Sequence, residues 1–512
     1  MKKLGLLFLV LFLGSSLQAQ DSLNMKKMAV LGGMGVEYND IWGYRMGTKE
    51  YGVIGSNSAI NIVDVTECGN PTLVHQWIDG SSVIWRDIKD YDDYIYAVCD
   101  GGACQEGLQV INKNTFAQSQ SLTHFRSAHN IFIEKESGRL YVVGSNTNGH
   151  GVIIFDLKTD PGNPTLLKNL NFRDLQNDPS GNYYVHDIYV LNDTAYCSHG
   201  YAGYRIWDMT DVNNVTLVAE LDDSNGYNHS SWRHAYEPYV YVAEEVPIGK
   251  PIYVYDLSDI TEPFTTYSFK DPLEAPNHNN NRPHNPFVLR NRLYISYYHD
   301  GVQVYDISNP ELPERIAYYD TYLNNNGNGY SGYQGAWGVY PYLPSGCIIA
   351  SDISSGLNTL ELTITPDADN VMPSNDIVID SEEKGIVFRT PDEQYIRVKI
   401  NLEVELDTVQ LSGMPDQRVE FGNSNLKFSA HANGVILKNP NGDYYKLAVE
   451  NDGTILIEAV PTLPSDAMVL KDEDLCFANI RSGMKLTSEN GTCYLYTLGE
   501  NGVEEVNNIS CD

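Results

Sequence analysis

The chain has 512 residues, 42% of them hydrophobic, and a formal net charge of −33 at pH 7. This length is several times that of a typical domain and supplies enough apolar residues for a large core. A negative charge of this size repels phosphate groups, which argues against nucleic acid and anionic membranes as partners. The charge suits a soluble exported protein or one that binds cations.

The first twenty residues have the features of a secretory signal peptide. Lys2 and Lys3 precede the apolar run 4–13, and Leu17-Gln18-Ala19 forms a small-residue cleavage site. The alternative is a buried N-terminal helix. We predict a signal peptide at residues 1–20 and a secreted or cell-surface protein. No later apolar run is long enough to span a bilayer, so no membrane span is expected.

The eight cysteines form an even number in a chain predicted to be exported, so disulfides are expected. Cys99 and Cys104 flank one short loop and are the best pair, and Cys476 and Cys493 are candidates to bridge a hairpin. Sequence alone does not pair the other four, which are Cys68, Cys197, Cys347 and Cys511. The chain has no CxxC motif, which argues against a zinc site made of thiolates.

An apolar strand that ends in Asp, Asn or Glu recurs along the first two-thirds of the chain. Consecutive copies are 44 to 55 residues apart. A period of this length with four strands per repeat is typical of β-propellers. The seven copies are NIVDV (Asp64), LQVIN (Asn112), VIIFDL (Asp156), YRIWDM (Asp208), IYVYDL (Asp256), VQVYDI (Asp306) and LNTLEL (Glu361).

Other features recur in register with this strand. An aromatic-rich strand precedes each copy, as in YIYAVCD at 94–100 and LYISYYHD at 293–300, and a further strand begins earlier in each unit. A turn with proline, such as Asn163-Pro164, follows several copies and leads into a fourth strand. We therefore predict an all-β fold with a seven-bladed propeller at residues 21–366. Six or eight blades are the alternatives, because ring closure often borrows a terminal strand.

The last 140 residues differ in character. Two stretches resemble each other, GIVFRTPDEQYIRVKI (385–400) and GVILKNPNGDYYKLAV (434–449), and a looser third copy starts at Asp474. Each is typical of a β-hairpin followed by another strand. A polar, turn-rich boundary lies at 365–375. We predict a small C-terminal all-β appendage of hairpin repeats at 376–512.

Four histidines occupy the same repeat position in consecutive units. In an antiparallel meander, the start of the first strand and the end of the second lie at the same rim. This rule places the four histidines, and the residues that end the second strands, around one mouth of the central channel. The predicted metal-binding residues are His129, His186, His229, His284, His199 and His299.

Imidazoles beside carboxylates are the ligands that zinc and other divalent transition metals prefer, whereas calcium fits less well. Two alternatives stay open, namely histidines that only form structural hydrogen bonds and histidines that titrate as a switch. If the protein is an enzyme, the candidate general bases are Glu244, Glu245 and Asp300. The sequence contains no GxSxG motif, P-loop or dinucleotide fingerprint.

The strings NIVDVTECGNP, IFDLKTDPGNP, VYDLSDITEP and VYDISNPELP resemble LVIVD repeats. Together with the signal peptide, residues 30–365 resemble the choice-of-anchor B family of exported bacterial proteins. The resemblance implies a secreted or surface-displayed propeller with a variable C-terminal region. It implies no activity. At the C-terminus, the sequence shows neither a hydrophobic anchor nor a sorting domain that we recognise.

These observations predict an exported binding module whose histidine-lined mouth holds a metal ion or a small polar ligand. Surface adhesion or recognition is the expected setting, with a small ligand, a glycan or a surface protein as partner. One alternative is a metal-dependent hydrolase or lyase acting at the same mouth. The other is a purely structural surface protein.

Overall fold

The computed structural model describes most of the chain from Ser22 onward, so the predicted signal peptide lies outside the described residues. Up to Thr363, the described residues are 22–78, 82–221, 226–234, 237–270, 282–289, 291–322, 332–343 and 345–363. Beyond Thr363 they are 370–372, 377–379, 385–389, 395–401, 404–411, 418–420, 426–428, 434–449, 454–463, 468–470, 474–477, 483–487, 493–498 and 504–509.

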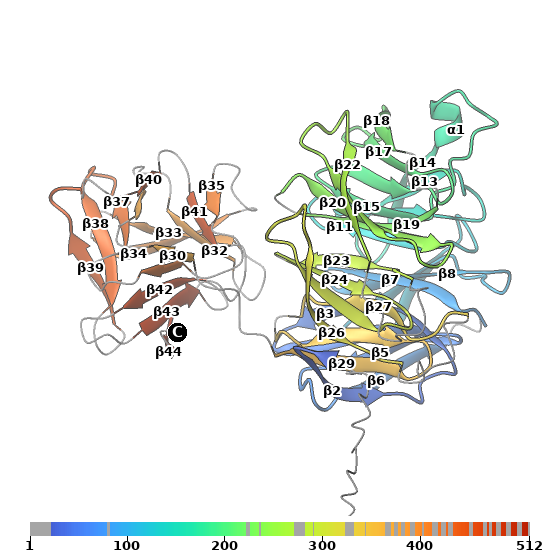
Figure 1. Ribbon diagram of the computed structural model, residues 1–512, viewed down its shortest axis with the longest axis horizontal. Helices are drawn as coiled ribbons and strands as arrows, with labels where there is room; N and C mark the ends of the chain where they lie inside the picture. Colours follow the sequence, from blue (N-terminus) through green and yellow to red (C-terminus); the bar gives the residue numbers. More distant parts are fainter. Residues whose placement is uncertain are drawn as a thin grey trace, which may run out of the picture.

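Seven antiparallel sheets form the blades of a propeller, which confirms the predicted fold (Figure 1). Blade 1 is β3 (Tyr38–Met46), β4 (Lys49–Ser56), β5 (Ala59–Asp64) and β6 (Thr72–Ile78). Blade 2 is β7 (Trp85–Tyr91), β8 (Tyr94–Asp100), β9 (Leu108–Asn112) and β10 (Gln118–Leu122). Blade 3 is β11 (Asn130–Glu134), β12 (Arg139–Val143), β13 (Gly151–Asp156) and β14 (Thr165–Asn171), followed by the short helix α1 (Phe172–Leu175).

The remaining blades follow the same order from the first strand outward. Blade 4 is β15 (Asp187–Leu191), β16 (Thr194–Ser198), β17 (Tyr204–Asp208) and β18 (Thr216–Leu221). Blade 5 is β19 (Tyr227–Arg233), β20 (Tyr239–Val246), β21 (Ile252–Asp256) and β22 (Phe264–Phe269). Blade 6 is β23 (Pro286–Leu289), β24 (Arg292–Ser296), β25 (Val302–Asp306) and β26 (Glu314–Tyr319), to which β1 (Ser22–Leu23) adds a fifth strand.

Blade 7 closes the ring with a strand from the other end of the propeller. It contains β27 (Ala336–Tyr340), β28 (Ile348–Asp352), β29 (Gly356–Leu362) and, as its outer strand, β2 (Met25–Leu31). β2 runs antiparallel to β29, with Lys27 opposite Leu360. A disulfide between Cys68 and Cys347 joins blade 1 to blade 7 beside this closure. The predicted Cys99–Cys104 disulfide is also present.

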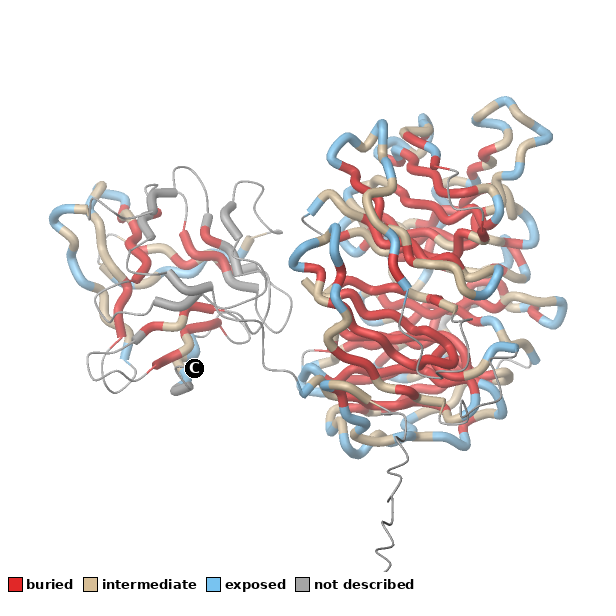
Figure 2. Tube along the Cα trace, in the orientation of Figure 1, coloured by how far each residue is buried: buried red, intermediate tan, exposed pale blue. Residues whose placement is uncertain are grey.

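The middle strands of each blade are buried on both faces because neighbouring blades pack against either side (Figure 2). In β13, for example, the four residues 152–155 are all at most 1% exposed. This double burial explains why these strands are runs of consecutive apolar residues and do not alternate with polar ones. The first strands, β3, β7, β11, β15, β19, β23 and β27, line the axis, where β3 packs between β7 and β27.

The C-terminal part contains three five-stranded sheets, and the predicted hairpins are present in it. Its first described strand is β30, which starts at Asn370 and therefore precedes the predicted start at residue 376. One sheet is β30 (Asn370–Met372), β36 (Leu426–Phe428), β42 (Met484–Thr487), β43 (Cys493–Leu498) and β44 (Glu504–Ile509). The second is β39 (Ile455–Ala459), β38 (Tyr444–Val449), β37 (Val435–Lys438), β31 (Ile377–Ile379) and β40 (Met468–Leu470). The third is β34 (Leu406–Leu411), β33 (Tyr395–Ile400), β32 (Ile386–Arg389), β41 (Asp474–Phe477) and β35 (Arg418–Glu420).

These three sheets are built alike. In each, an antiparallel three-stranded hairpin unit continues into two short strands that pair in parallel and come from the other repeats. The buried faces of all three sheets share one core, which includes Ile386, Val435 and Met484 at equivalent positions. The side chain of Cys476 lies outside the described residues, so its predicted pairing with Cys493 stays a prediction. No helix among the described residues is long and apolar enough to cross a bilayer.

Candidate functional site

One residue at the start of each blade's first strand faces the same end of the central channel. In four consecutive blades this residue is histidine, and in blade 7 it is Trp337. The mouth that they surround is a small cavity of about 30 Å³ that is open to solvent on one side. Its lining residues are Asp40, Trp85, Arg86, Asp87, His129, Asn130, His186, His229, His284, Asn285 and Trp337.

The four imidazoles lie side by side around the mouth with neighbouring ring planes tilted by 40° to 51°, and we call His129, His186, His229 and His284 the histidine ladder. The ring centroids are 4.2 Å apart from His129 to His186, 4.4 Å from His186 to His229, and 4.3 Å from His229 to His284. Trp337 continues the series, with its ring 5.0 Å from that of His284. Residues about fifty positions apart in the sequence thus become neighbours through the repeat.

Three ladder rings are held by the backbone of the next blade. Nδ1 of His186 donates to the carbonyl oxygen of His229 at 3.0 Å, and Nδ1 of His229 donates to that of His284 at 3.2 Å. Nδ1 of His284 donates in the same way to the carbonyl of Trp337. A carbonyl oxygen only accepts hydrogen bonds, so Nδ1 carries the proton in each ring. In the neutral ring, Nε2 therefore keeps its lone pair.

The environment keeps these three rings neutral. Burial lowers the pKa of His186 and of His284 well below the usual value, and neighbouring imidazoles lower it further. Burial also lowers the pKa of His229, although the carboxylate of Glu245 opposes the shift. Neutral imidazoles with Nδ1 bound to a carbonyl have the protonation state and orientation of metal ligands.

His129 differs from the other ladder rings because its partner is a carboxylate. Its Nδ1 lies 2.8 Å from Oδ2 of Asp100, which ends β8 in the preceding blade. The side chains of His129 and Asp100 are 18% and 31% exposed, so this pair is the more open end of the ladder.

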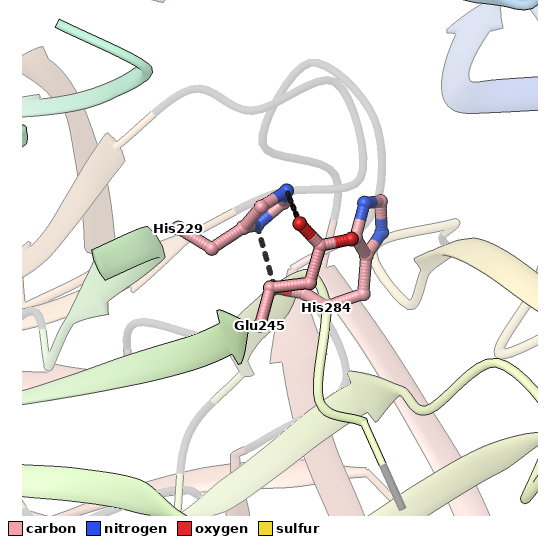
Figure 3. A group of neighbouring side chains, drawn as sticks. All are labelled: His229, Glu245 and His284. Carbon is pink, nitrogen blue, oxygen red and sulfur yellow. Dashed lines mark hydrogen bonds and ion pairs between the residues drawn. The ribbon is translucent and has the colours of Figure 1, made fainter. Parts of the chain in front are cut away.

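Glu245, on β20, joins the other end of the ladder (Figure 3). The ligand atoms of His229, Glu245 and His284 all lie within 4.8 Å of one another. Oε2 of Glu245 is 3.8 Å from Nε2 of His229, and its Oε1 accepts a 2.9 Å hydrogen bond from the hydroxyl of Tyr298. We call His229, Glu245 and His284 the three-ligand cluster.

The other predicted residues lie elsewhere. His199 packs against Phe172, with ring centroids 6.0 Å apart, and His299 packs against Tyr322 at 5.5 Å. Both histidines follow the second strands of their blades, and these aromatic partners are not members of the ladder. The side chains of Glu244 and Asp300, two of the three candidate bases, are fully buried. Glu244 accepts a hydrogen bond from Asn228.

A layer of acids lies just below the ladder, and the sequence analysis missed it. Asp87 accepts a 2.6 Å bond from Nζ of Lys89 and the backbone N–H of Ile131 at the same distance. Asp40 accepts the backbone N–H of Ile88 at 2.9 Å. Burial, followed by the charge of Asp87, raises the pKa of Asp40 well above its usual value. The layer thus links successive blades, and Lys89 neutralises part of it.

Aromatic rings close the channel below the acids. They stand three residues after the mouth position in six of the seven blades, where Lys89 takes the seventh place. Neighbouring centroids are 4.7 to 5.1 Å apart in the three successive contacts of blades 3 to 6 and 4.9 Å apart between blades 7 and 1. The rings belong to Trp42, Phe132, Tyr189, Trp232, Phe287 and Tyr340.

Comparison with known proteins indicates no specific function. No family model matches the chain, and no curated protein matches it. Solved structures with a similar fold include the WD40 repeats of RRP9, with 8% identity and a TM-score of 0.48 over 66% of this chain and 97% of that one. The β-propeller domain of Cps50 (Swd1) from Myceliophteria thermophila has 10% identity and a TM-score of 0.47 over 67% and 100% of the two chains. A functionally unknown protein from Desulfotomaculum acetoxidans has 15% identity and a TM-score of 0.41 over 57% and 87%.

Proposed function

We propose that this protein is an exported binding module that holds a divalent transition-metal ion in the three-ligand cluster. The observation that carries the proposal is the meeting of two neutral imidazoles and a carboxylate, with ligand atoms within 4.8 Å of one another. Small side-chain movements would bring these atoms to the 2.0–2.2 Å bonds of a zinc-type site. The carbonyl partners of His229 and His284 orient the rings as such sites require.

Three protein ligands leave at least one coordination position open. Sites of this type bind water or an exogenous molecule at the open position. His229 and His284 line the mouth of the channel, so the open position can face solvent there. We therefore propose that a small polar ligand, or an oxygen atom of a glycan or surface protein, completes the coordination.

A purely structural role explains part of this arrangement. The Nδ1 bonds join each blade to the next, and this alone would favour histidine at the repeat position. It does not account for Glu245, whose carboxylate faces Nε2 of His229 across 3.8 Å. A partly exposed carboxylate that faces a neutral imidazole attracts a cation, and a metal ion would bind both groups.

Export is part of the proposal. The apolar N-terminal run with its basic start supports it, and so do two disulfides, because disulfides persist in oxidising compartments. Secretion can be tested by fractionating cells that express the full chain. Processed protein outside the cytoplasm would agree with export, and full-length protein retained in the cytoplasm would contradict it.

A second candidate function is a metal-dependent hydrolase or lyase, and the His129–Asp100 pair favours it. An Asp–His pair holds the imidazole in one tautomer and stabilises the imidazolium that forms when the ring takes a proton. His129 is then a better candidate base than the buried Glu244 and Asp300. Chelator-sensitive cleavage of nitrophenyl esters that falls in His129→Gln would support this candidate. Cleavage that is unchanged in the variant would contradict it.

Metal analysis of the purified protein tests the main proposal. After dialysis against zinc and gel filtration, we expect about one ion per chain in the wild type and little in His229→Ala or Glu245→Gln. His75→Ala is the matched control. His75 lies on β6, the outer strand of blade 1, where its ring packs against Phe116, whereas the ladder lies at the first strands. Equal zinc in all four proteins, or none in the wild type, would contradict the proposal.

A further inference from the structure

We propose that Tyr298 holds Glu245 as a ligand with one free oxygen and so makes the cluster select transition-metal ions over calcium. This inference rests on the proposed metal-binding function. Tyr298 does not occupy a repeat position that the sequence marks as part of the site, and its contact with Glu245 would explain why the cluster selects one class of metal ion.

The two oxygens of Glu245 have different partners. Oε1 accepts the hydroxyl of Tyr298 at 2.9 Å, whereas Oε2 faces Nε2 of His229 at 3.8 Å. The hydroxyl uses one lone pair of Oε1 and orients the carboxylate so that Oε2 is the oxygen that faces the imidazole. Calcium takes six to eight oxygen ligands and often includes a carboxylate that binds through both oxygens. Two imidazole nitrogens and one carboxylate oxygen suit zinc, cobalt or nickel instead.

The backbone of Tyr298 is in the left-handed region, with φ of +46°. This conformation is unusual for a bulky residue, and such outliers persist only where the surroundings enforce them. Here the backbone of Ala336 pairs with Tyr298 in both directions, at 3.0 and 2.8 Å. The neighbouring Gly335 permits this approach, because a Cβ there would lie 2.1 Å from the carbonyl oxygen of Tyr298.

The side chain of Tyr298 is fixed as well as the backbone. The residue is 2% exposed, and its ring packs 4.6 Å from that of His284 and 5.2 Å from that of Tyr333. A phenylalanine would fill the same space, so packing alone does not explain the hydroxyl. The hydroxyl has one contact that bears on the metal site, which is the bond to Glu245.

Tyr298→Phe removes this hydroxyl and keeps the ring. We expect the dissociation constant for zinc to rise about 10- to 100-fold, as for other residues that orient metal ligands. The weak binding of calcium should stay the same or become tighter, because Oε1 is released. Tyr204→Phe is the matched control, since the buried Tyr204 loses a hydroxyl bond of the same length, 2.9 Å, to Ser231. The control should bind zinc like the wild type.

A double-mutant cycle with Glu245→Gln shows whether Tyr298 acts through Glu245. We expect Tyr298→Phe to change zinc affinity less than twofold in the Glu245→Gln background. An equal loss in both backgrounds, or an equal loss of zinc and calcium affinity, would overturn the inference. If the wild type bound zinc and Tyr298→Phe bound it equally well, the role of Tyr298 would be wrong, but the proposed function would stand. A wild type that binds no zinc would overturn both.

The absorption spectrum of bound cobalt reports the coordination geometry, and thermal unfolding of each metal-free variant checks folding.

Discussion

His229 shows how one residue can serve the fold and the site at once. Its Nδ1 donates to the carbonyl of His284 in the next blade, and its Nε2 faces Glu245. The first contact joins two blades, and the second creates the place for a cation. His186 makes the same contact with the next blade but is not one of the three residues of the three-ligand cluster. The two residues can therefore be separated by experiment.

Replacing His186 should affect the fold more than metal binding. We expect His186→Ala to lower the free energy of unfolding by about 1–3 kcal/mol, because the carbonyl of His229 loses its donor inside the protein. Zinc affinity should fall far less than in His229→Ala. Urea denaturation and zinc titration measure the two effects. If His186→Ala abolished zinc binding in a folded protein, the assignment of three ligands would be wrong.

Asp187 predicts a dependence of stability on pH. Burial, together with the charge of Asp87, raises its pKa from 3.8 to about 6. The fold thus favours the protonated carboxyl, and this contribution to stability is present below pH 3.8 and is lost as the pH rises through about 6. Asp187→Asn should therefore stabilise the protein by about 3 kcal/mol at pH 8 and by little at pH 4. Urea denaturation at both values measures the difference, and an equal effect at both would contradict the explanation.

The residues of the site were predictable to different degrees. The four ladder histidines repeat at one position of the blade, so their convergence follows from the repeat. Tyr298 was not predictable, because its role depends on a left-handed backbone and on one hydroxyl contact. Lys89 stands where the other blades have an aromatic ring, three residues after the mouth position, so the spacing of the repeat marks this exception.

At the scale of elements, the critical contact is the ring closure in blade 7. The outer strand β2 comes from the N-terminal end of the propeller and pairs with β29. The Cys68–Cys347 disulfide ties blades 1 and 7 together across 279 residues of sequence. A link across so long a stretch removes much of the conformational freedom of the unfolded chain.

Removing this disulfide should destabilise the propeller strongly. In the loop-entropy model, we expect the double variant Cys68→Ser, Cys347→Ser to lose about 5 kcal/mol of unfolding free energy. Removing Cys99–Cys104, which closes a loop of 5 residues, should cost about 2 kcal/mol. Urea denaturation compares the two. If the short-loop variant were the less stable one, closure would not be the main role of Cys68–Cys347.

The strands were predictable because periodic apolar runs and proline turns mark them locally. That a terminal strand can close the ring was expected only as a general property of propellers, because β2 (MKKMAVL) has none of the sequence markers of the repeat. The Cys68–Cys347 pair could not be predicted, since its partners become neighbours only once the ring is closed.

At the scale of the molecule, the chain combines two repeat architectures. The propeller repeats are separate sheets, whereas each C-terminal sheet takes short parallel strands from the other repeats. The hairpins of the C-terminal part were predictable from their turns. The interleaving was not, because strands of three residues, such as β30 and β31, have too little pattern to indicate a partner.

Anomalous diffraction from crystals soaked in zinc would test the central claim most directly. Data collected above and below the zinc absorption edge locate the ion without any assumption about its ligands. We predict one strong peak at the channel mouth, bonded to Nε2 of His229, Oε2 of Glu245 and Nε2 of His284. A mouth without a peak, or zinc bound only at other residues, would contradict the account.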